Sequence, residues 1–315
     1  MMQIFHSLEE LASNASPSVI TIGNFDGVHC GHQAVIAEVI ARARHRNARS
    51  VAVTFDPHPA HILHDGPKLP LITPLPEKLA LLAKTGIDLV LVLPFDSSLR
   101  LLSAQQFAQS VLAEGLHAVE VHEGETFRFG HNAQAGVHDL SLLGNDLNFT
   151  VHACQPCILR GAAVSSSRIR KLIAAGSLAE ARALLGRPFS IHSTPAPGRG
   201  YGTRYTVPTI NLAPYPELLP ANGVYITTLR VAEKTFRGVT NAGNRPTFGA
   251  DSFAVETHLL NFEPLTLTEE TPLELTFLHR LRPEQRFASP EALRTQIALD
   301  VARAQRYFHL CDALS

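Results

Sequence analysis

The sequence contains little cysteine, no long hydrophobic run and no excess of charge of one sign. Four cysteines in 315 residues are too few for a disulfide-stapled scaffold, and no apolar run approaches the roughly 20 residues of a membrane-spanning helix. Residues 1–7 lack the basic stretch and following apolar stretch of a secretory signal. The 27 Lys and Arg residues balance 28 Asp and Glu residues, whereas nucleic-acid-binding domains usually carry a basic excess. We therefore expect a cytoplasmic protein without nucleic-acid or membrane partners.

The chain has enough apolar material for two hydrophobic cores. Hydrophobic residues make up 45% of it, which excludes a disordered chain. Its 315 residues are about twice the usual length of a domain. We expect an N-terminal domain over residues 1–186 and a C-terminal domain over residues 187–315, with the boundary just after a helical stretch at residues 178–185.

The first half of the chain alternates between two hydrophobic periods. Short continuous apolar runs occupy residues 19–23, 51–55, 89–93 and 118–121, and stretches with helical periodicity lie between them at residues 31–46, 77–84 and 104–113. Buried strands that alternate with helices predict a Rossmann-like α/β fold, with a parallel sheet covered on both faces. Ligands of such sheets bind beyond the carboxyl ends of the strands.

The pattern changes near residue 189. Glycine, proline and threonine separate short β-rich runs at residues 205–212, 223–231, 236–241, 253–261 and 273–277. This pattern is typical of an antiparallel β-barrel or sandwich. Residues 289–308 then have the apolar spacing of an amphipathic helix, which we expect to close the chain.

A glycine-rich loop leads from the first apolar run into the first helix. It reads Thr21-Ile-Gly-Asn-Phe-Asp-Gly-Val-His-Cys-Gly-His32. A helix start offers N–H groups and a positive dipole end to an anion. His29 and His32, three residues apart at that start, could bind an α-phosphate and stabilise the charge that builds as it is attacked.

Two spacings are also those of zinc ligands. His29 and His32 form a His-x-x-His pair, but no third ligand follows at an obvious spacing. Cys154 and Cys157 have Cys-x-x-Cys spacing, for which a structural zinc would need a second pair. We therefore interpret the histidines as phosphate ligands and the two cysteines as structural residues.

Several stretches together resemble the bifunctional bacterial riboflavin kinase/FAD synthetase family. The string His29-Cys-Gly-His32 looks like the H-x-G-H motif of nucleotidylyltransferases. The resemblance continues in Thr54-Phe-Asp-Pro-His-Pro59, Phe127-Arg-Phe-Gly130, Val164-Ser-Ser-Ser-Arg-Ile-Arg170 and the domain junction Leu185-Gly-Arg-Pro-Phe189. It spans essentially the whole chain, and it implies a nucleotidylyltransferase domain followed by a riboflavin kinase barrel.

The resemblance implies residues for the first site. His29 and His32 are implied as catalytic, and the implied nucleotide-binding residues are Gly23, Phe25, Asp26, Gly31, His58, Ser165, Ser166, Ser167 and Arg170. The implied flavin-binding residues are Phe55, Pro57, Thr126, Phe127 and Phe129 in this half, together with Arg282 in the β-rich half. The three serines precede an expected helix at residues 169–175, so their hydroxyls could bind phosphate oxygens beside the fork of Arg170, or simply cap that helix.

The second site is expected on the β-rich half. Thr209 and Asn211 share one face of a strand, because strand side chains alternate, and they offer the hard oxygen ligands that Mg²⁺ prefers. The resemblance implies that they hold Mg²⁺ and that Glu256 accepts the proton of the riboflavin 5′-hydroxyl; from spacing alone, Glu256 is a solvent-facing residue. The implied kinase residues that bind ATP are Gly198, Gly202 and Pro208.

The resemblance implies two ATP-dependent reactions. One converts riboflavin to FMN with Mg²⁺, and the other converts FMN to FAD with release of pyrophosphate. Residues 202–206 depart from the family pattern, so a monofunctional FAD synthetase whose barrel only binds flavin stays an alternative. A flavin sensor without turnover and a nucleotidylyltransferase with another acceptor are two more. The expected partners are the small molecules riboflavin, FMN and ATP, and the expected state is a monomer or weak homo-oligomer.

Overall fold

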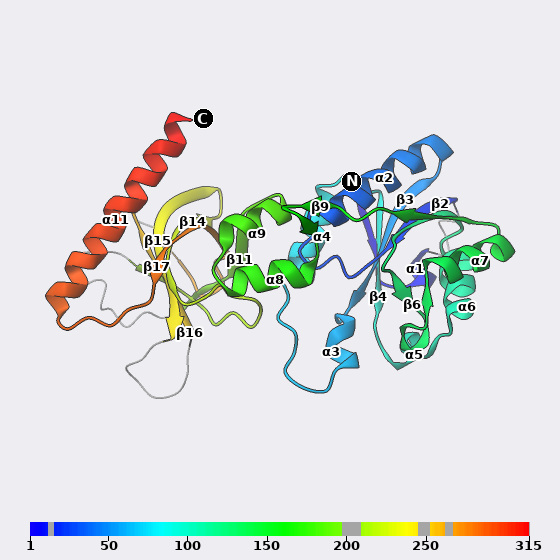
Figure 1. Cartoon of the computed structure of the whole chain (residues 1–315), viewed down its shortest axis with the longest axis horizontal. Coiled ribbons are helices and arrows are strands. Elements are labelled where there is room, and N and C mark those ends of the chain that lie inside the picture. Colours follow the sequence, from blue (N-terminus) through cyan, green and yellow to red (C-terminus); the bar gives the residue numbers. More distant parts are fainter. Residues whose placement is uncertain (12–15, 197–208, 245–252, 262–266, 315) are drawn as a thin grey trace. The chain divides into compact units, whose positions relative to one another are not determined.

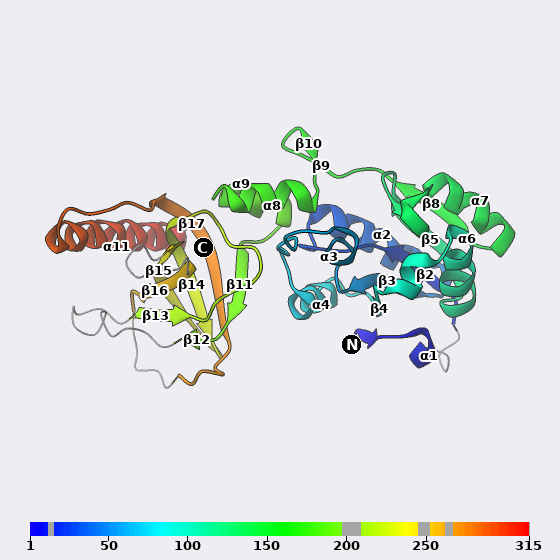
Figure 2. The ribbon, with the colours of Figure 1, turned by 90° about the horizontal axis from the view of Figure 1, so that it is seen from below.

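The computed structural model describes residues 1–11, 16–196, 209–244, 253–261 and 267–314 (Figures 1 and 2). Its contacts divide the chain into two compact units, Met1–Ser166 and Ser167–Ser315. Helix α9 (Leu178–Leu185) packs against two strands of the second unit, so the contacts group it there, together with most of α8 (Ser166–Ala174). The boundary that the sequence indicates, between residues 186 and 187, remains a prediction.

The first unit is built on a six-stranded parallel sheet, which confirms the predicted α/β class. The strand order is β1-β4-β3-β2-β5-β8. The strands are β1 (Gln3–Phe5), β2 (Ser18–Ile22), β3 (Arg49–Asp56), β4 (Leu89–Pro94), β5 (Ala118–Gly124) and β8 (Thr150–Cys154). The edge strands β1 and β8 were not predicted, because β1 has only three residues and β8 is largely exposed, so neither forms a continuous apolar run.

Helices cover both faces of this sheet, as expected. Along β3 the side chains alternate, so Val51 and Val53 join one hydrophobic cluster and Ala52 joins another. Phe107 and Leu140 belong to the first cluster, which places α6 (Ala104–Phe107), a π-helical segment (Ala108–Gly115) and α7 (Val137–Leu147) on that face. On the other face lie α2 (Cys30–Arg46) and α4 (Leu75–Ala83).

The first unit also contains several short elements. They are α1 (Leu8–Leu11), α3 (Pro59–Leu63), α5 (Ser97–Leu101), a 3-10 turn (His131–Ala133) and the short strands β6 (Arg128–Phe129), β7 (Ala135–Gly136), β9 (Ile158–Leu159) and β10 (Ala162–Ala163).

The second unit contains a seven-stranded antiparallel sheet, in agreement with the predicted β-rich half. Its order is β11-β17-β14-β15-β16-β13-β12. The strands are β11 (Phe189–Ser193), β12 (Pro195–Ala196), β13 (Thr209–Leu212), β14 (Gly223–Val231), β15 (Lys234–Asn244), β16 (Phe253–Leu259) and β17 (Leu273–Pro283). The two outermost strands, β11 and β12, are joined by the single residue Thr194, so the sheet must curl until these strands meet at that residue. This is the barrel-like geometry that the sequence predicts.

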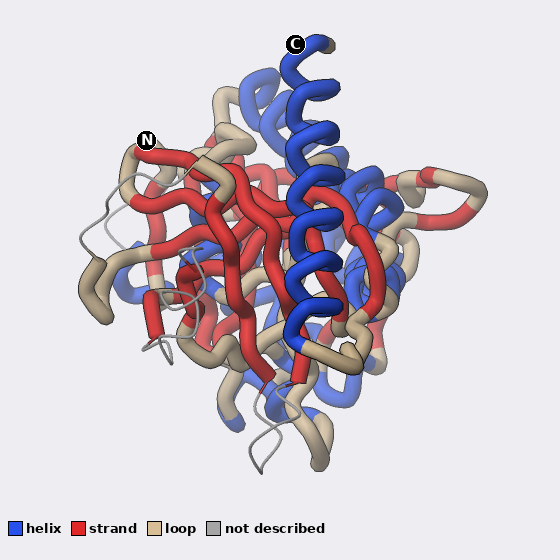
Figure 3. The backbone as a smooth tube through the Cα atoms, turned by 90° about the vertical axis from the view of Figure 1, so that its left-hand side faces the viewer, coloured by secondary structure: helices blue, strands red, loops and turns tan. Residues whose placement is uncertain are grey.

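The two faces of the curled sheet carry different side chains. On one face, hydroxyls of three buried threonines form a chain, Thr227 to Thr240 at 2.7 Å and Thr240 to Thr257 at 2.9 Å. The other face packs Val224 and Val239 against the long helix α11 (Pro290–Ala313), seen beside the strands in Figure 3. The predicted helix at residues 289–308 is therefore confirmed, with Ser289 as its N-cap.

Candidate active sites

The loop between β2 and α2 is a tight turn held by the hydrophobic core. Phe25 and Val28 have φ angles of 46° and 38°, a region that residues other than glycine rarely adopt. Their side chains are almost fully buried among residues of α2, α4 and the sheet, and this packing keeps the backbone in the strained conformation. The turn therefore fixes the start of α2 at the carboxyl end of the sheet.

Asp26 anchors this turn to the segment before α4. Its buried carboxylate accepts the backbone N–H groups of Ile72 at 2.9 Å and Thr73 at 3.0 Å, and the Thr73 hydroxyl accepts the N–H of Gly27 at 2.9 Å. The Ser166 hydroxyl donates to the Asp26 carbonyl at 2.7 Å. Asp26 and Ser166 thus position the loop, while the nucleotide contacts expected of them remain predictions.

His29 and His32 lie together at the tip of α2. His29 is the N-cap, and its Nδ1 accepts the backbone N–H of His32 at 3.2 Å. The two rings are stacked, with centroids 3.6 Å apart and planes 15° apart. Because Nδ1 of His29 is an acceptor, its neutral ring carries the proton on Nε2. Nε2 is then the N–H donor of this ring, and its contact with a phosphate oxygen remains a prediction.

The His32 ring is held in its neutral form. Burial lowers the pKa of His32 well below its usual value, and the nearby His29 and Lys78 lower it further. Its Nδ1 is buried and has no hydrogen-bond partner in the part of the chain that the structure describes. A buried polar atom without a partner costs free energy that a ligand can recover. The tip of α2 therefore has the character of a binding site.

Two glycines make room for this arrangement. A Cβ atom at Gly31 would lie 3.2 Å from the His29 ring, and one at Gly23 would lie 3.2 Å from the Phe25 ring. Both distances are tighter than ordinary packing, so a side chain would displace the ring. The glycines thus permit the close ring packing, and their contact with the nucleotide remains a prediction.

The carboxyl end of β3 leads into a second capped helix. His58 is the N-cap of α3, where its buried ring accepts the N–H of Ala60 at 3.1 Å through Nδ1. The preceding Asp56–Pro57 peptide bond is cis. Strand β3 ends at Asp56. The carboxyl edge of the parallel sheet, where ligands of such sheets bind, therefore carries Phe55, Pro57 and His58. Their contacts with nucleotide and flavin remain predictions.

The predicted flavin-side loop has one core residue. Phe129 is 7% exposed and belongs to the hydrophobic core together with Phe107. Phe127 stacks on Phe129 with centroids 5.5 Å apart, and Thr126 is exposed. Phe129 thus supports the loop from the core side. Flavin contacts of Thr126, Phe127 and Phe129 remain predictions.

The serine segment enters a helix earlier than predicted. Helix α8 begins at Ser166 rather than near residue 169. Ser166 and Ser167 therefore belong to its first turn and do not precede the helix. Arg170 lies on the same helix, one turn further on. The phosphate contacts of Ser165, Ser167 and Arg170 remain predictions.

Lys78 is a buried lysine that sequence reasoning missed. It lies on α4 and is 3% exposed, and its Nζ donates to the Thr54 hydroxyl at 3.3 Å. Burial lowers the pKa of Lys78, while Asp26 and Asp56 raise it. The sequence does contain one indication that Lys78 is buried: its spacing places it on the same helix face as Leu75 and Leu82.

Glu123 is a second buried charged residue that was missed. It is the last residue but one of β5. Its carboxyl group accepts a hydrogen bond from the backbone N–H of Ile22 in β2 and another from the Thr21 hydroxyl at 3.4 Å. Burial raises the pKa of Glu123 well above its usual value. It thereby fixes the strand end from which the histidine loop departs.

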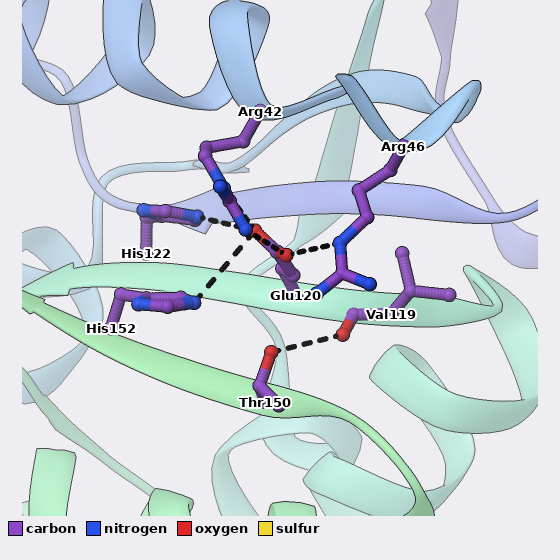
Figure 4. A network of polar contacts seen from close by, with 7 residues as sticks. All are labelled: Arg42, Arg46, Val119, Glu120, His122, Thr150 and His152. Carbon is purple, nitrogen blue, oxygen red and sulfur yellow. Dashed lines mark hydrogen bonds and ion pairs between the residues drawn. The ribbon is translucent and has the colours of Figure 1, made fainter. Parts of the chain in front are cut away.

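A polar network surrounds Glu120 in β5 (Figure 4). Its carboxylate accepts hydrogen bonds from Arg42 at 2.9 and 2.6 Å and from Arg46 at 2.5 Å, and it lies 3.2 Å from His122 and 3.8 Å from His152. The glutamate and the two histidines are close enough to share a metal ion. Two guanidinium groups already face the carboxylate, however, and would repel a cation. We interpret the network as ion pairs that join α2 to the sheet.

Replacing Glu120 with glutamine is expected to flatten the acid limb of the stability curve. The hydrogen bond from Arg42 is the largest cause that lowers the pKa of Glu120, to about 2 from its usual 4.5. A depressed folded-state pKa means that the stabilisation is complete above pH 4.5 and is lost as the pH falls toward 2. Urea titrations across this range should show a steeper decline in the free energy of unfolding for the wild type than for Glu120→Gln. Glu114→Gln, an exposed change in the same unit, is the control; identical slopes for Glu120→Gln and wild type would contradict the assignment.

A zinc ion at His29 and His32 would need further ligands close to them. Within the described ranges, the cluster of three ligating side chains at Glu120 includes neither histidine. The four cysteines are free thiols. The interpretation of the pair as phosphate ligands remains a prediction.

In the second unit, one row of residues crosses five neighbouring strands. Asn211 of β13 pairs directly with Glu256 of β16, Glu256 with Asn241 of β15, Asn241 with Val224 of β14, and Val224 with Arg282 of β17. Directly opposed residues share a face and have Cβ atoms about 4.5–5.5 Å apart. The predicted metal ligand and the predicted base are therefore neighbours, a relation that only the strand register reveals.

The other predicted residues of this unit have different surroundings. Thr209 lies two residues from Asn211 on the same face of β13 and is exposed. Arg282 forms an ion pair with Asp300 of α11 at 2.9 Å, and its guanidinium lies 5.6 Å from the centre of the Phe287 ring. The cation of Arg282 thus ties the sheet to α11, and its flavin contact remains a prediction.

Three predicted kinase residues lie outside the described residues. Gly198, Gly202 and Pro208 all fall within residues 197–208. Their contacts with ATP remain predictions.

The candidate residues form two groups on two different folds. One is a histidine pair at a helix tip on a parallel sheet, and the other is an amide–carboxylate row on an antiparallel sheet. Residues 11–168 match the family model described as FAD synthetase, and residues 185–308 match the model described as riboflavin kinase. The chain belongs to the bifunctional riboflavin kinase/FAD synthetase family.

Relatives of the same length support this assignment. The chain is 37% identical to the bifunctional riboflavin kinase/FMN adenylyltransferase of Pseudomonas fluorescens, over 96% of this chain and 97% of that protein. It is 34% identical to the protein of that name from Escherichia coli K12, over 93% of each. A solved structure titled macrolide-efflux protein from Streptococcus pneumoniae superposes with a TM-score of 0.86 at 25% identity, over 96% of this chain and 98% of that one. In the described part of this chain, we find no helix with the length and apolarity to cross a bilayer.

Proposed function

We propose that the chain performs two successive ATP-dependent steps. The second unit phosphorylates the 5′-hydroxyl of riboflavin to give FMN, and the first unit transfers AMP from ATP to FMN to give FAD and pyrophosphate. The matches of both halves to family models and the full-length bifunctional relatives support this function over the monofunctional alternative. The observation that carries it is the stacked histidine pair that caps α2.

The adenylyl step uses the tip of α2. A phosphate oxygen of FMN forms a bond to the α-phosphorus of ATP, the bond from that phosphorus to the bridging oxygen breaks, and pyrophosphate leaves with the electron pair. Nε2–H of His29 and the neutral ring of His32 donate to the oxygens on which negative charge develops. Since both rings are preorganised by capping and stacking, little reorganisation is needed in the transition state.

The kinase step uses the row across the curled sheet. Glu256 accepts the proton of the riboflavin hydroxyl as its oxygen attacks the γ-phosphorus of ATP, and ADP leaves. Thr209 and Asn211 would hold Mg²⁺, because a hydroxyl and an amide oxygen beside a carboxylate are hard ligands suited to it. The ion, when bound, neutralises charge on the ATP phosphates. The direct pairing of Asn211 with Glu256 supports this division of roles.

Products formed from riboflavin test the proposal directly. The full chain is incubated with riboflavin, ATP and Mg²⁺, and the flavins are separated by chromatography. We expect FMN to appear first and FAD to follow. Conversion of added FMN to FAD without any FMN from riboflavin would support the monofunctional alternative, and bound flavin with neither product would support the sensor.

Location and assembly are part of the proposal. The free thiols of all four cysteines fit a reducing compartment, and we propose the cytoplasm. A monomer or weak homo-oligomer remains the expected state.

A further inference from the structure

Lys78 is a buried positive charge on an otherwise apolar helix face. Its neighbours on α4, Leu75 and Leu82, face the cluster between this helix and the sheet. Only 3% of Lys78 is exposed. Removing an ammonium group from water costs free energy unless a partner compensates it. A lysine at such a place therefore requires a reason other than packing.

The partners of Lys78 within the described residues do not balance its charge. An ammonium group has three N–H donors, and one of them reaches the Thr54 hydroxyl at 3.3 Å. Asp26 and Asp56 attract it electrostatically, but among the described residues it forms no ion pair with a carboxylate. The Asp26 carboxylate accepts backbone N–H groups instead. Lys78 is thus held in place without a neutralising contact.

The position of Lys78 relates it to the first site. Thr54 lies near the carboxyl end of β3, the edge at which the histidine loop also leaves β2. The charge of Lys78 acts on His32, whose pKa it lowers. The His32 ring has a buried Nδ1 with no partner in the described part of the chain. A buried cation and an unsatisfied imidazole at one edge of the sheet together suit an anion.

We propose that Lys78 supplies the positive charge that receives the phosphate groups of ATP during adenylyl transfer. This role rests on the proposed function of the first unit. As the α-phosphorus bonds to the FMN phosphate oxygen and its bond to the bridging oxygen breaks, negative charge moves to the departing pyrophosphate. A fixed ammonium beside that group stabilises the charge without a proton transfer.

Lys78→Met tests this assignment, with Lys84→Met as a matched control. Lys84 is exposed and directly follows the same helix. We expect Lys78→Met to lower kcat/KM for ATP in FAD formation by about 10- to 100-fold, the range for one hydrogen bond to a charged group. KM for pyrophosphate in the reverse reaction, which returns FAD to FMN and ATP, should rise. Riboflavin phosphorylation by the same chain should be unchanged, and Lys84→Met should behave like the wild type.

The melting temperatures of Lys78 variants distinguish a role in ATP binding from a purely structural role. Methionine has a similar volume and no charge to desolvate, so Lys78→Met should remain folded with a melting temperature close to that of the wild type. Lys78→Arg should retain part of the activity because it keeps the charge. FAD formation at the wild-type efficiency in Lys78→Met would overturn the proposal. The proposal would also be overturned if Lys78→Met and Lys78→Arg both had a lowered melting temperature and Lys78→Arg recovered none of the FAD formation. Absence of FAD formation from FMN in the wild type would instead overturn the proposed function itself.

Discussion

Replacing His29 with alanine is expected to slow FAD formation from FMN by about 10²–10³-fold, the usual effect of removing a donor to transition-state charge. The ring of His29 offers Nε2–H because its Nδ1 is committed to the N–H of His32. Alanine removes that donor and the stacked partner of His32 together. The rate of FAD formation from FMN and ATP measures the effect.

A cap-preserving variant separates chemistry from folding in this experiment. Loss of an N-cap destabilises a helix by about 1 kcal/mol, so His29→Ala alone changes two things. Asparagine caps well but lacks the imidazole, so His29→Asn should keep the fold and still lose FAD formation. Riboflavin phosphorylation by the same protein is the internal control. If His29→Asn forms FAD at the wild-type rate, the helix-tip mechanism fails.

Glu256→Gln is expected to have the opposite selectivity. Loss of a positioned base typically costs about 10²–10⁴ in rate, so FMN formation from riboflavin should fall by this factor. Conversion of added FMN to FAD should continue. Both rates can be followed by chromatography with riboflavin or FMN as the starting flavin.

Glu233→Gln is the matched change for this test. Glu233 is exposed in the same unit and lies between β14 and β15, so its substitution should leave both rates unaltered. FMN formation at full rate in Glu256→Gln would remove the carboxylate from the mechanism. It would also return Glu256 to the solvent-facing role that spacing alone favours.

The local pattern of apolar residues predicts most elements of the fold, and it misses strands in which that pattern is weak. The continuous apolar runs in β2, β3 and β4 are buried on both faces and were therefore recognisable. Strand β8 is largely exposed, so its sequence has no such run. The strands of the curled sheet pair across long stretches of sequence, and the hydrophobic period of one segment predicts only that it is a strand, not its partner.

The sequence predicts which site residues lie close together only where those residues are also close in sequence. His29 and His32 lie one helical turn apart, so their meeting followed from a helix start. Asn211 and Glu256 meet through strand register, a relation between distant segments. Lys78 was missed because a lysine in an amphipathic helix is usually a surface residue, and only the packing around α4 shows that it is buried.

The one-residue connection at Thr194 has a consequence for solubility. Because Thr194 alone separates β11 from β12, the two outermost strands of the sheet start from the same corner, and the two margins of the sheet converge there. A longer connection would allow these margins to separate and would offer them to strands of other molecules. We therefore expect the tight corner at this point to reduce edge-to-edge pairing between molecules.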